Sequence, residues 1–383
     1  MKFNRSWGRE GRSEMQLAGG PPEAVTLLSV VAPTILSFFS TADALALRLI
    51  CREFTEAVSR HPWAERTVIR GRIAVWRACF PRAICANVSR RNPWYKGGRR
   101  AEVGDEDFAH FAGLHELWID SAFGLTNAAF AHLGSVKVLH MHSVSFDKLT
   151  PEAFAHLISL RELSLGTSSA RAQVVSDLFF AQLKRQLRTL RLRARGITGA
   201  VFAHFRGIEN LDMSGCLVAS DAVFEHLKGI KKLDMSLCNQ ATITDAAFEH
   251  LKGIQRLYMS GCNQATITDA AFEHLKGIQK LDMSLCNQAT ITDAAFEHLK
   301  GIQELDMSGC NQATITDAAF AHLSGIQRLD MSGCTQATIT GAAFAHLRGI
   351  KRLEMRDCSV EVKRAAFAAG LPVAKPLEPE EEQ

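Results

Sequence analysis

A unit of 24 residues recurs through the second half of this chain, and it constrains the fold more than any other feature. The unit that begins at Cys238 returns almost unchanged from Cys262 and Cys286, and with a few substitutions from Cys310 and Cys334. A fixed period of about 20–50 residues is typical of a solenoid, in which each unit contacts only its neighbours. One unit cannot bury its own apolar face, so stacking must do so. The sequence therefore predicts an elongated stack of units.

Each unit is expected to contribute one short strand. Ile254, Leu257 and Met259 are the apolar positions that point inward, and Cys262 follows at the turn. The same frame can be laid on the earlier, more variable part of the chain, which predicts eleven strands from residue 105 onward. Their first apolar positions are Leu114, Val136, Leu160, Leu187, Ile208, Ile230, Ile254, Ile278, Ile302, Ile326 and Ile350.

The other half of the unit predicts a helix of two turns. Phe272 and Leu275 lie three residues apart, so they share one face of that helix. Thr268 or Asp269 can cap it, because a side-chain oxygen at this position accepts a hydrogen bond from a free backbone N–H. Gly277 marks the end of the helix and allows the chain to turn into the next strand.

The frame Ile254–x–x–Leu257–x–Met259–x–x–Cys262 resembles the cysteine-containing leucine-rich repeats that are common in F-box proteins. That resemblance implies an α/β solenoid with parallel strands on the concave face and short helices on the convex face. The cysteine row of residues 216, 238, 262, 286, 310, 334 and 358 then lies inside the turns. Buried thiols of this kind are usually inert, so disulfides and a zinc site are not expected.

A second resemblance concerns the residues before the solenoid. The pieces 35–39, 43–45 and 50–54, followed by Trp63, match in order the middle of an F-box, which is a small all-α module. The resemblance implies that residues 23–66 dock on the Skp-type adaptor of a cullin-based ubiquitin ligase and that the concave face holds a protein substrate. The residues expected to contact the adaptor are Ile35, Leu36, Phe39, Leu45, Leu49, Ile50 and Phe54.

Two other interpretations remain open at this point. In the first, the chain is a stand-alone repeat scaffold, and its N-terminal helices only cap the solenoid. Such a cap would bury its apolar residues against the first repeat, whereas a docking module would expose them. In the second, the basic N-terminal third, with Arg90, Arg91, Lys96, Arg99 and Arg100, contacts nucleic acid. We expect these basic residues to form an exposed loop instead, in which Trp94 and Tyr95 belong either to a contact patch or to an ordinary loop.

The expected organisation has five parts. A loose arm precedes the helical module, and a degenerate capping repeat with Phe80, Ala83 and Cys85 inward, and Asn87 or Val88 at its turn, follows it. An acidic tail ends the chain. The ranges are 1–22 for the disordered arm, 23–66 for the F-box-like module, 67–103 for the capping repeat and loop, 104–370 for the solenoid, and 371–383 for the tail.

The sequence offers no catalytic constellation. It has no phosphate-binding glycine loop, no nucleophile elbow and no H-E-x-x-H motif, and we expect neither an enzyme nor a cofactor. The histidine that recurs from His132 to His346 is expected on the convex surface, without bound metal. Residues 1–17 do not resemble a signal peptide, and no apolar run has the length of a membrane span. A cytoplasmic or nuclear protein is expected.

The concave face is where we expect partner binding. Alternate strand residues face it, which predicts a mostly basic row and, beside it, an almost wholly acidic row from Asn210 onward. The two rows could neutralise each other, or the carboxylates could bind a partner segment; Tyr258 interrupts the acids, and Trp118, His140 and His142 form a more individual patch. The candidate residues are Trp118, His140, His142, Arg191, Asp212, Asp234, Arg256, Tyr258, Asp282, Asp306, Arg328 and Asp330.

Overall fold

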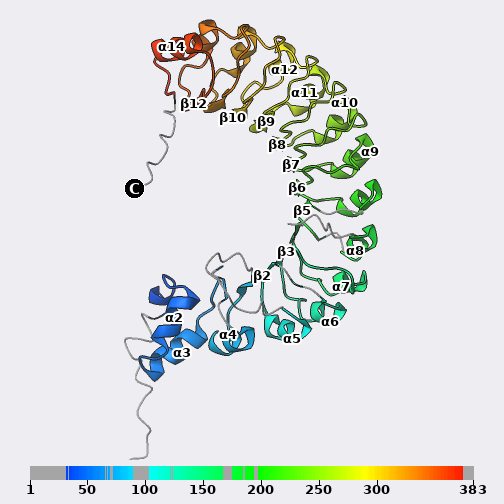
Figure 1. Cartoon of the computed structure of the whole chain (residues 1–383), viewed down its shortest axis with the longest axis vertical. Coiled ribbons are helices and arrows are strands. Elements are labelled where there is room, and N and C mark those ends of the chain that lie inside the picture. Colours follow the sequence, from blue (N-terminus) through cyan, green and yellow to red (C-terminus); the bar gives the residue numbers. More distant parts are fainter. Residues whose placement is uncertain are drawn as a thin grey trace, which may run out of the picture.

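A computed structural model describes residues 32, 34–64, 66, 68–69, 72–88, 103–120, 122, 124–166, 175–183, 186–193 and 197–373. The expected arm at 1–22, the basic loop with Arg90, Arg91, Trp94 and Tyr95, and most of the expected tail lie outside these residues. The chain forms an open arc, with strands along its inner edge and helices along its outer edge (Figure 1).

The inner edge is one sheet of twelve parallel strands in sequential order. The expected eleven strands are β2–β12, and β1 adds another at the N-terminal edge. The bounds are β1 (Cys85–Val88), β2 (Glu116–Asp120), β3 (Val138–His142), β4 (Glu162–Gly166), β5 (Thr189–Arg193), β6 (Asn210–Asp212), β7 (Lys232–Asp234), β8 (Arg256–Tyr258), β9 (Lys280–Asp282), β10 (Glu304–Asp306), β11 (Arg328–Asp330) and β12 (Arg352–Glu354).

The outer edge carries short helical segments. The N-terminal helices are α2 (Thr41–Leu47), α3 (Arg52–Arg60) and α4 (Ile73–Cys79), and α14 (Val360–Ala368) closes the C-terminal end. The repeat helices are α5 (Asp105–Phe108), α6 (Asn127–Phe130), α7 (Glu152–Ala155), α8 (Asp177–Ala181), α9 (Asp221–Phe224), α10 (Asp245–Phe248), α11 (Asp269–Phe272), α12 (Asp293–Glu297) and α13 (Asp317–Phe320). Short 3₁₀ segments follow or replace them at Ala109–Phe111, Gly199–Phe205, Glu225–Leu227, Glu249–Leu251, Glu273–Leu275, Ala321–Leu323 and Gly341–His346.

The repeat helix is shorter than the expected two α-helical turns, because its second half is a 3₁₀ turn. Phe272 ends α11, and Leu275 ends the 3₁₀ segment that follows it. Both side chains are fully buried, so they share the predicted face. Gly277 then takes a φ of +85°, a left-handed conformation that glycine adopts without a steric penalty. The chain therefore turns into β9 where the sequence indicated.

Thr268 and Asp269 were alternative caps in the sequence, and the structure gives them separate tasks. The Thr268 side chain accepts a hydrogen bond from the Ala270 N–H and is the cap. The Asp269 carboxylate accepts from the Thr292 N–H and the Thr292 hydroxyl, both at 2.7 Å, and so joins its repeat to the next. The same pairing joins Asp105 to Thr126, Asp177 to Thr198, Asp221 to Thr244, Asp245 to Thr268, Asp293 to Thr316 and Asp317 to Thr340.

The cysteine row provides a second link between repeats. The Cys262 thiol donates to the Met235 carbonyl at 3.2 Å, and the Cys286 thiol donates to the Met259 carbonyl at 3.1 Å. Burial raises the pKa of the Cys262 thiol to about 12. A thiol with so high a pKa carries almost no thiolate at neutral pH, and the thiolate is the reactive form.

The N-terminal helices pack on one end of the solenoid through Trp63. Its ring is buried, lies 5.5 Å from the ring of Phe80, and donates to the Val58 carbonyl at 2.8 Å. The Trp63 carbonyl in turn accepts from the Ile84 N–H at 2.8 Å. Trp63 therefore connects α3 to the segment that enters β1.

Two local expectations are corrected here. Asn87 and Val88 belong to β1 and pair with Trp118 and Ile119, instead of forming a turn, because β2 offers them a parallel neighbour. At the start of α2 the sequence offers Thr41 or Asp43 as the cap, but the structure uses Ser40. Ser40 accepts from the Asp43 N–H, and the Asp43 carboxylate accepts from the Ser40 N–H. Phe80, Ala83 and Cys85 are buried, as expected.

Asp269→Ala should reduce the free energy of unfolding by about 2 kcal/mol, since hydrogen bonds to a charged group contribute about 1.5–3 kcal/mol. The change removes both hydrogen bonds to Thr292. Urea unfolding followed by circular dichroism measures the effect. Glu273→Ala, at an exposed position of the same helical segment, is the control and should leave the midpoint unchanged. Equal midpoints for the two variants would contradict this role of the Asp–Thr pairs.

Thiol labelling at pH 8 should separate the cysteines by burial. Cys51 is exposed and should react rapidly with a disulfide reagent, whereas the buried thiols of the repeat row should react only after unfolding. Mass spectrometry of the labelled peptides identifies the sites. Rapid labelling of Cys262 or Cys286 in the native chain would show that the row is open to solvent.

Candidate functional site

Two rows of charged side chains cross the concave face in strict register. The basic row contains one residue from each of β7–β12, and the acidic row contains the residue two positions later on the same strand. The basic row is Lys232, Arg256, Lys280, Glu304, Arg328 and Arg352. The acidic row is Asp234, Tyr258, Asp282, Asp306, Asp330 and Glu354, and Asp212 of β6 extends it.

Several members of the basic row are already paired. The Lys280 ammonium lies 2.8 Å from the Glu304 carboxylate, which also lies 4.0 Å from the Arg328 guanidinium. The hydrogen bond from Lys280 lowers the pKa of Glu304. The ammonium groups of Lys232 and Lys280 lie 5.1 and 5.8 Å from the centre of the Tyr258 ring, within reach of a cation–π interaction. Glu304 and Tyr258, rather than the aspartates, therefore balance these cations.

The aspartates of the acidic row are bonded to their own strand ends. Asp282 accepts from the Ser284 N–H and hydroxyl, and Asp306 accepts in the same way from Ser308. Within the described residues, no lysine or arginine forms an ion pair with Asp234, Asp282, Asp306 or Asp330. Burial raises the pKa of Asp306, and Asp282 and Asp330 raise it further. Glu354 pairs with Arg352 of the basic row at 2.6 Å, but these four aspartates are not neutralised by the basic row beside them.

A shallow groove of about 170 Å³ follows these rows from Tyr258 to Glu354. A second hollow, of about 340 Å³, lies at the C-terminal end between the turn at 335–340 and the start of α14. The groove on the concave face is the one that brings charged side chains from several repeats together. It can accommodate a polypeptide segment, whereas neither hollow has the depth of a small-molecule pocket.

The patch near the N-terminal end of the sheet differs from the expected one. His140 was expected to face solvent, but only 3% of it is exposed, because its ring stacks on Trp118 with 3.7 Å between centroids. Burial, and to a smaller extent the Arg191 guanidinium, lowers the pKa of His140 to about 4. His142, which is half-buried, lies 3.3 Å from the Ser164 hydroxyl. The two histidines therefore belong to a packed layer. Arg191, the candidate residue on the neighbouring part of the sheet, is exposed.

A buried carboxylate that the sequence did not indicate holds this layer together. Glu116 is 9% exposed, its carboxylate lies 2.6 Å from the Arg66 guanidinium, and it accepts from the Trp118 indole N–H at 2.5 Å. Arg66 also lies over the Trp118 ring, at 5.5 Å from its centre. Fifty residues separate Arg66 from Glu116, so no local spacing pattern could have shown the pair.

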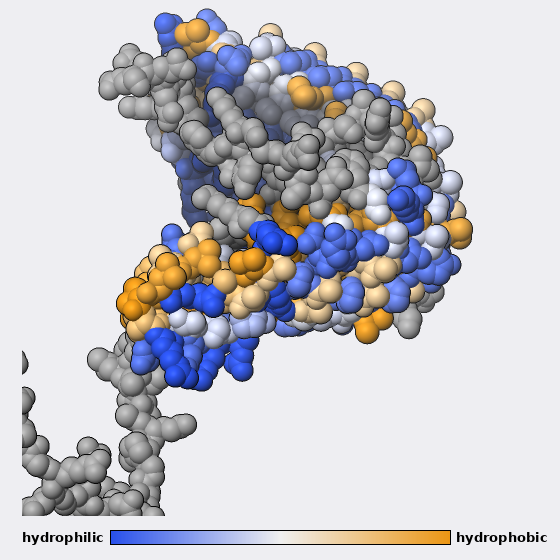
Figure 2. All heavy atoms as spheres, turned by 60° about the horizontal axis from the view of Figure 1, so that its bottom comes forward, coloured by the Kyte–Doolittle hydropathy of each residue, from blue (hydrophilic) through white to orange (hydrophobic). Residues whose placement is uncertain are grey.

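The N-terminal helices expose a group of large apolar side chains. Phe38 is 83% exposed, Leu49 88% and Ile50 64%. Apolar atoms gather over this end of the arc in Figure 2. We name the group the N-terminal apolar surface; it consists of Ile35, Phe38, Phe39, Leu45, Leu49 and Ile50. Phe38 was not among the expected residues. Leu36 and Phe54 were both expected to contact the adaptor. Leu36 is fully buried in the core instead, and Phe54 is half-buried.

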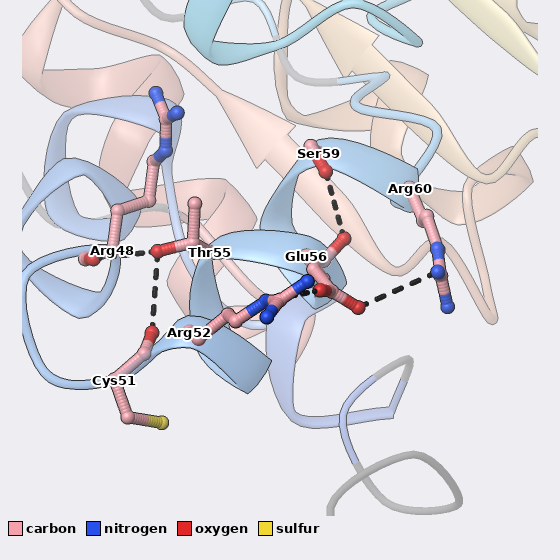
Figure 3. A network of polar contacts seen from close by, with 7 residues as sticks. All are labelled: Arg48, Cys51, Arg52, Thr55, Glu56, Ser59 and Arg60. Carbon is pink, nitrogen blue, oxygen red and sulfur yellow. Dashed lines mark hydrogen bonds and ion pairs between the residues drawn. The ribbon is translucent and has the colours of Figure 1, made fainter. Parts of the chain in front are cut away.

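Polar contacts on α3 fix the loop that carries Leu49 and Ile50. The Thr55 hydroxyl lies 2.7 Å from the Arg48 carbonyl and 3.2 Å from the Cys51 carbonyl, which anchors both ends of that loop (Figure 3). Farther along α3, the Glu56 carboxylate accepts from Arg52 at 3.1 Å and from Arg60 at 3.4 Å. The Thr55 hydroxyl therefore holds the backbone of the loop, while the side chains of Leu49 and Ile50 stay exposed.

Comparison with known families decides the classification. The family model described as the BspA-type leucine-rich-repeat region matches six copies in the overlapping ranges 124–255, 168–279 and 241–370. The chain belongs to this family. Leucine-rich repeats of this kind typically form non-catalytic binding scaffolds, so the protein is a repeat scaffold suited to protein–protein interaction.

Solved structures support the same fold for this BspA-type repeat protein. It is similar to the Toll chain in the Toll–Spatzle complex of Drosophila, with 15% identity, a TM-score of 0.57 and coverage of 82% of this chain but only 45% of that one. It is also similar to an internalin, InlF, of Listeria monocytogenes, with 14% identity, a TM-score of 0.56 and coverage of 92% and 100%. The alignment therefore spans less than half of the Toll chain. No curated protein matches the sequence.

The described part of this BspA-type repeat protein shows neither a membrane-spanning helix nor a metal-binding cluster. Every helix there is too short or too polar to cross a membrane. Those residues also contain no group of three or more His, Cys, Asp or Glu side chains placed to hold a metal ion. The recurrent histidines are half-buried or exposed beside the helical segments.

Asp306→Asn should leave the melting temperature at pH 7 unchanged or higher. The raised pKa of Asp306 means that its charged form weakens the folded state above that pKa, and this penalty disappears as the pH falls and the carboxyl is protonated. The asparagine can still accept from Ser308, so the difference from the unmodified chain should shrink with acidification.

Glu304→Gln provides the contrast for that experiment. It removes the partner of Lys280, so the melting temperature at pH 7 should fall. Differential scanning calorimetry between pH 3 and pH 7 measures both variants. A lower melting temperature for Asp306→Asn at pH 7 would show that the acidic row is internally balanced.

Proposed function

We propose that this BspA-type leucine-rich-repeat protein is a substrate receptor of a Skp–cullin–F-box type ubiquitin ligase. Residues 23–66 would dock on the Skp-type adaptor, and the concave face would hold a protein substrate. The chain itself would catalyse nothing; it would raise the effective concentration of the substrate near the ligase. The observation that carries the proposal is the N-terminal apolar surface.

The exposure of these side chains favours docking over capping. A cap would bury its apolar residues against the first repeat, yet Phe38 and Leu49 are more than four-fifths exposed. Grouped exposed apolar side chains of this size mark interaction surfaces in soluble proteins. The residues also fall within the stretch that resembles an F-box. Leu36 is the expected contact residue that we now assign to the core.

The concave face suits the second half of the proposal. Its rows repeat with the strands, so a partner segment lying along the arc meets one set of side chains per repeat. Toll, a similar solenoid, is known in complex with another protein, Spatzle. We place the receptor in the cytoplasm or nucleus, where the ligase components reside, with the solenoid at 104–370.

A stand-alone scaffold is the second candidate, and Trp63 is the observation that favours it. This residue is buried and joins α3 to the first strand, which is what a cap requires. Trp63 and the N-terminal apolar surface are separate residues, however, so the helices can attach to the solenoid and still present a free surface. Binding of nucleic acid is not expected, and it would weaken steeply with salt.

Replacing Leu49 and Ile50 by Glu should abolish co-purification with a Skp-type adaptor. Both side chains are exposed, so the variant should melt within about 1 °C of the unmodified chain, since surface changes usually alter stability by less than ~0.5 kcal/mol. A chain lacking residues 1–66 should also lose the adaptor. Ile158→Glu, at an exposed apolar position of the solenoid, is the matched control and should retain it.

Two results would contradict the receptor function. One is failure of the unmodified chain to retain any adaptor, with a lower melting temperature for the truncated chain, which would make the helices a cap. The other is equal retention of the adaptor by the Leu49/Ile50 variant and the Ile158 control.

A further inference from the structure

Two leucines occupy backbone positions that the neighbouring repeats give to glycine. Leu237 and Leu285 directly precede Cys238 and Cys286, with φ of +61° and +57°. Four of the other repeats have glycine at the equivalent position, Gly215, Gly261, Gly309 and Gly333, with φ between +66° and +68°, and the last repeat has Asp357, with φ of +55°. In this left-handed conformation the Cβ of an L-residue crowds the following carbonyl oxygen, whereas glycine has no Cβ. Both leucines are therefore strained at a position where four other repeats avoid strain.

Burial of these side chains does not explain the strain. Leu237 is 61% exposed and Leu285 is 54% exposed. Each leucine leans over the glycine of the next repeat: a Cβ added at Gly309 would lie 2.6 Å from a Leu285 methyl group, and one added at Gly261 would lie 3.0 Å from a Leu237 methyl group. A leucine at this position thus requires a glycine at the same position of the next repeat, as Gly261 follows Leu237 and Gly309 follows Leu285. Strain of this kind at exposed side chains points to a functional role.

The arrangement forms two apolar knobs at a defined distance. Leu237 and Leu285 follow β7 and β9, which are two strands apart in one parallel sheet. Neighbouring strands lie about 4.8 Å apart, so the knobs are about 10 Å apart along the arc. Two residues seven positions apart on a helix are also separated by about 10 Å, at 1.5 Å per residue.

The carboxylates beside these two leucines favour a partner with basic side chains. Asp234 and Asp282 lie three residues before Leu237 and Leu285, at the ends of the same strands. No lysine or arginine of the described residues forms an ion pair with either carboxylate. Asp306 lengthens this row on the next strand. A segment that covers the leucines would therefore bring its neighbouring side chains to carboxylates that still lack a cation.

We propose that Leu237 and Leu285 bind a helical segment of a partner protein that has apolar residues seven positions apart and a row of Lys or Arg facing the acidic row. The segment lies along the arc and covers β7–β10. This inference rests on the proposed function, because it names the class of segment that the concave face receives. The basic side chains supply charge complementarity, and the apolar pair fixes the register.

The test uses the full chain and a phage-displayed library of random 16-residue peptides. Selected peptides should be rich in Lys and Arg and should carry apolar residues seven positions apart. The most enriched peptide is then synthesised, and its affinity is measured by fluorescence anisotropy. L237G/L285G and D282N/D306N should each weaken binding at least tenfold. The glycine pair restores the residue that neighbouring repeats use, so that variant should melt no lower than the unmodified chain and a loss of binding is not a loss of fold.

Three results would overturn the proposal: no enrichment of any peptide, selection of acidic or uncharged peptides, or unchanged affinity for L237G/L285G. Co-purification with the Skp-type adaptor is measured on the same variants and should be unaffected. If the unmodified chain retains the adaptor but selects no basic peptide, this inference alone is overturned. Absence of the adaptor with the peptide still bound would overturn the receptor function and leave the partner class intact.

Discussion

The pairing of an aspartate with the threonine of the next repeat is the interaction on which this architecture depends. Asp269 stands in the first turn of α11, where a negative charge is favoured by the helix dipole, and its carboxylate binds the backbone and hydroxyl of Thr292. Thr292 in turn caps α12. Each capping residue is thus held by the previous repeat, so one helix positions the next. A short helical segment that would be unstable alone is fixed in this way.

This uniform linkage has a cost on the opposite side of the molecule. Because every repeat is placed in the same register, like side chains are brought into rows, as with Asp282, Asp306 and Asp330. Burial and mutual repulsion raise the pKa of Asp306, and no cation of the described residues pairs with it. The array holds these carboxylates in place without neutralising them. A binding surface for basic segments follows from the same geometry that stabilises the stack.

The two candidate surfaces lie in different parts of the chain and use different forces. The N-terminal apolar surface is held by Thr55 and linked to the solenoid through Trp63. The concave face carries the acidic row, and the exposed Leu237 and Leu285 follow two of its strands. Under the proposed function, the solenoid between them would hold an adaptor and a second partner at a fixed separation, as a receptor requires.

The period in the sequence was enough to predict the strands, the inward residues and the turn at Gly277, because each depends only on the local repeat. Features that depend on distant contacts were not predictable. His140 is buried because Trp118 stacks on it, and Glu116 depends on Arg66 from outside the repeats. The left-handed conformation of Leu237 was not predicted either, since φ depends on the folded backbone. The glycines at the same position of other repeats, such as Gly215, Gly261 and Gly309, are the signal that could have indicated it.

Hydrogen–deuterium exchange of the full chain, alone and with a Skp-type adaptor, tests the central claim that one solenoid presents two separate surfaces. The account predicts new protection in residues 34–54 on addition of the adaptor. It also predicts slow exchange of the Thr268, Thr292 and Thr316 amides in both samples, since each donates to an aspartate. Fast exchange at these threonines, or adaptor-dependent protection in the concave strands instead of residues 34–54, would contradict it.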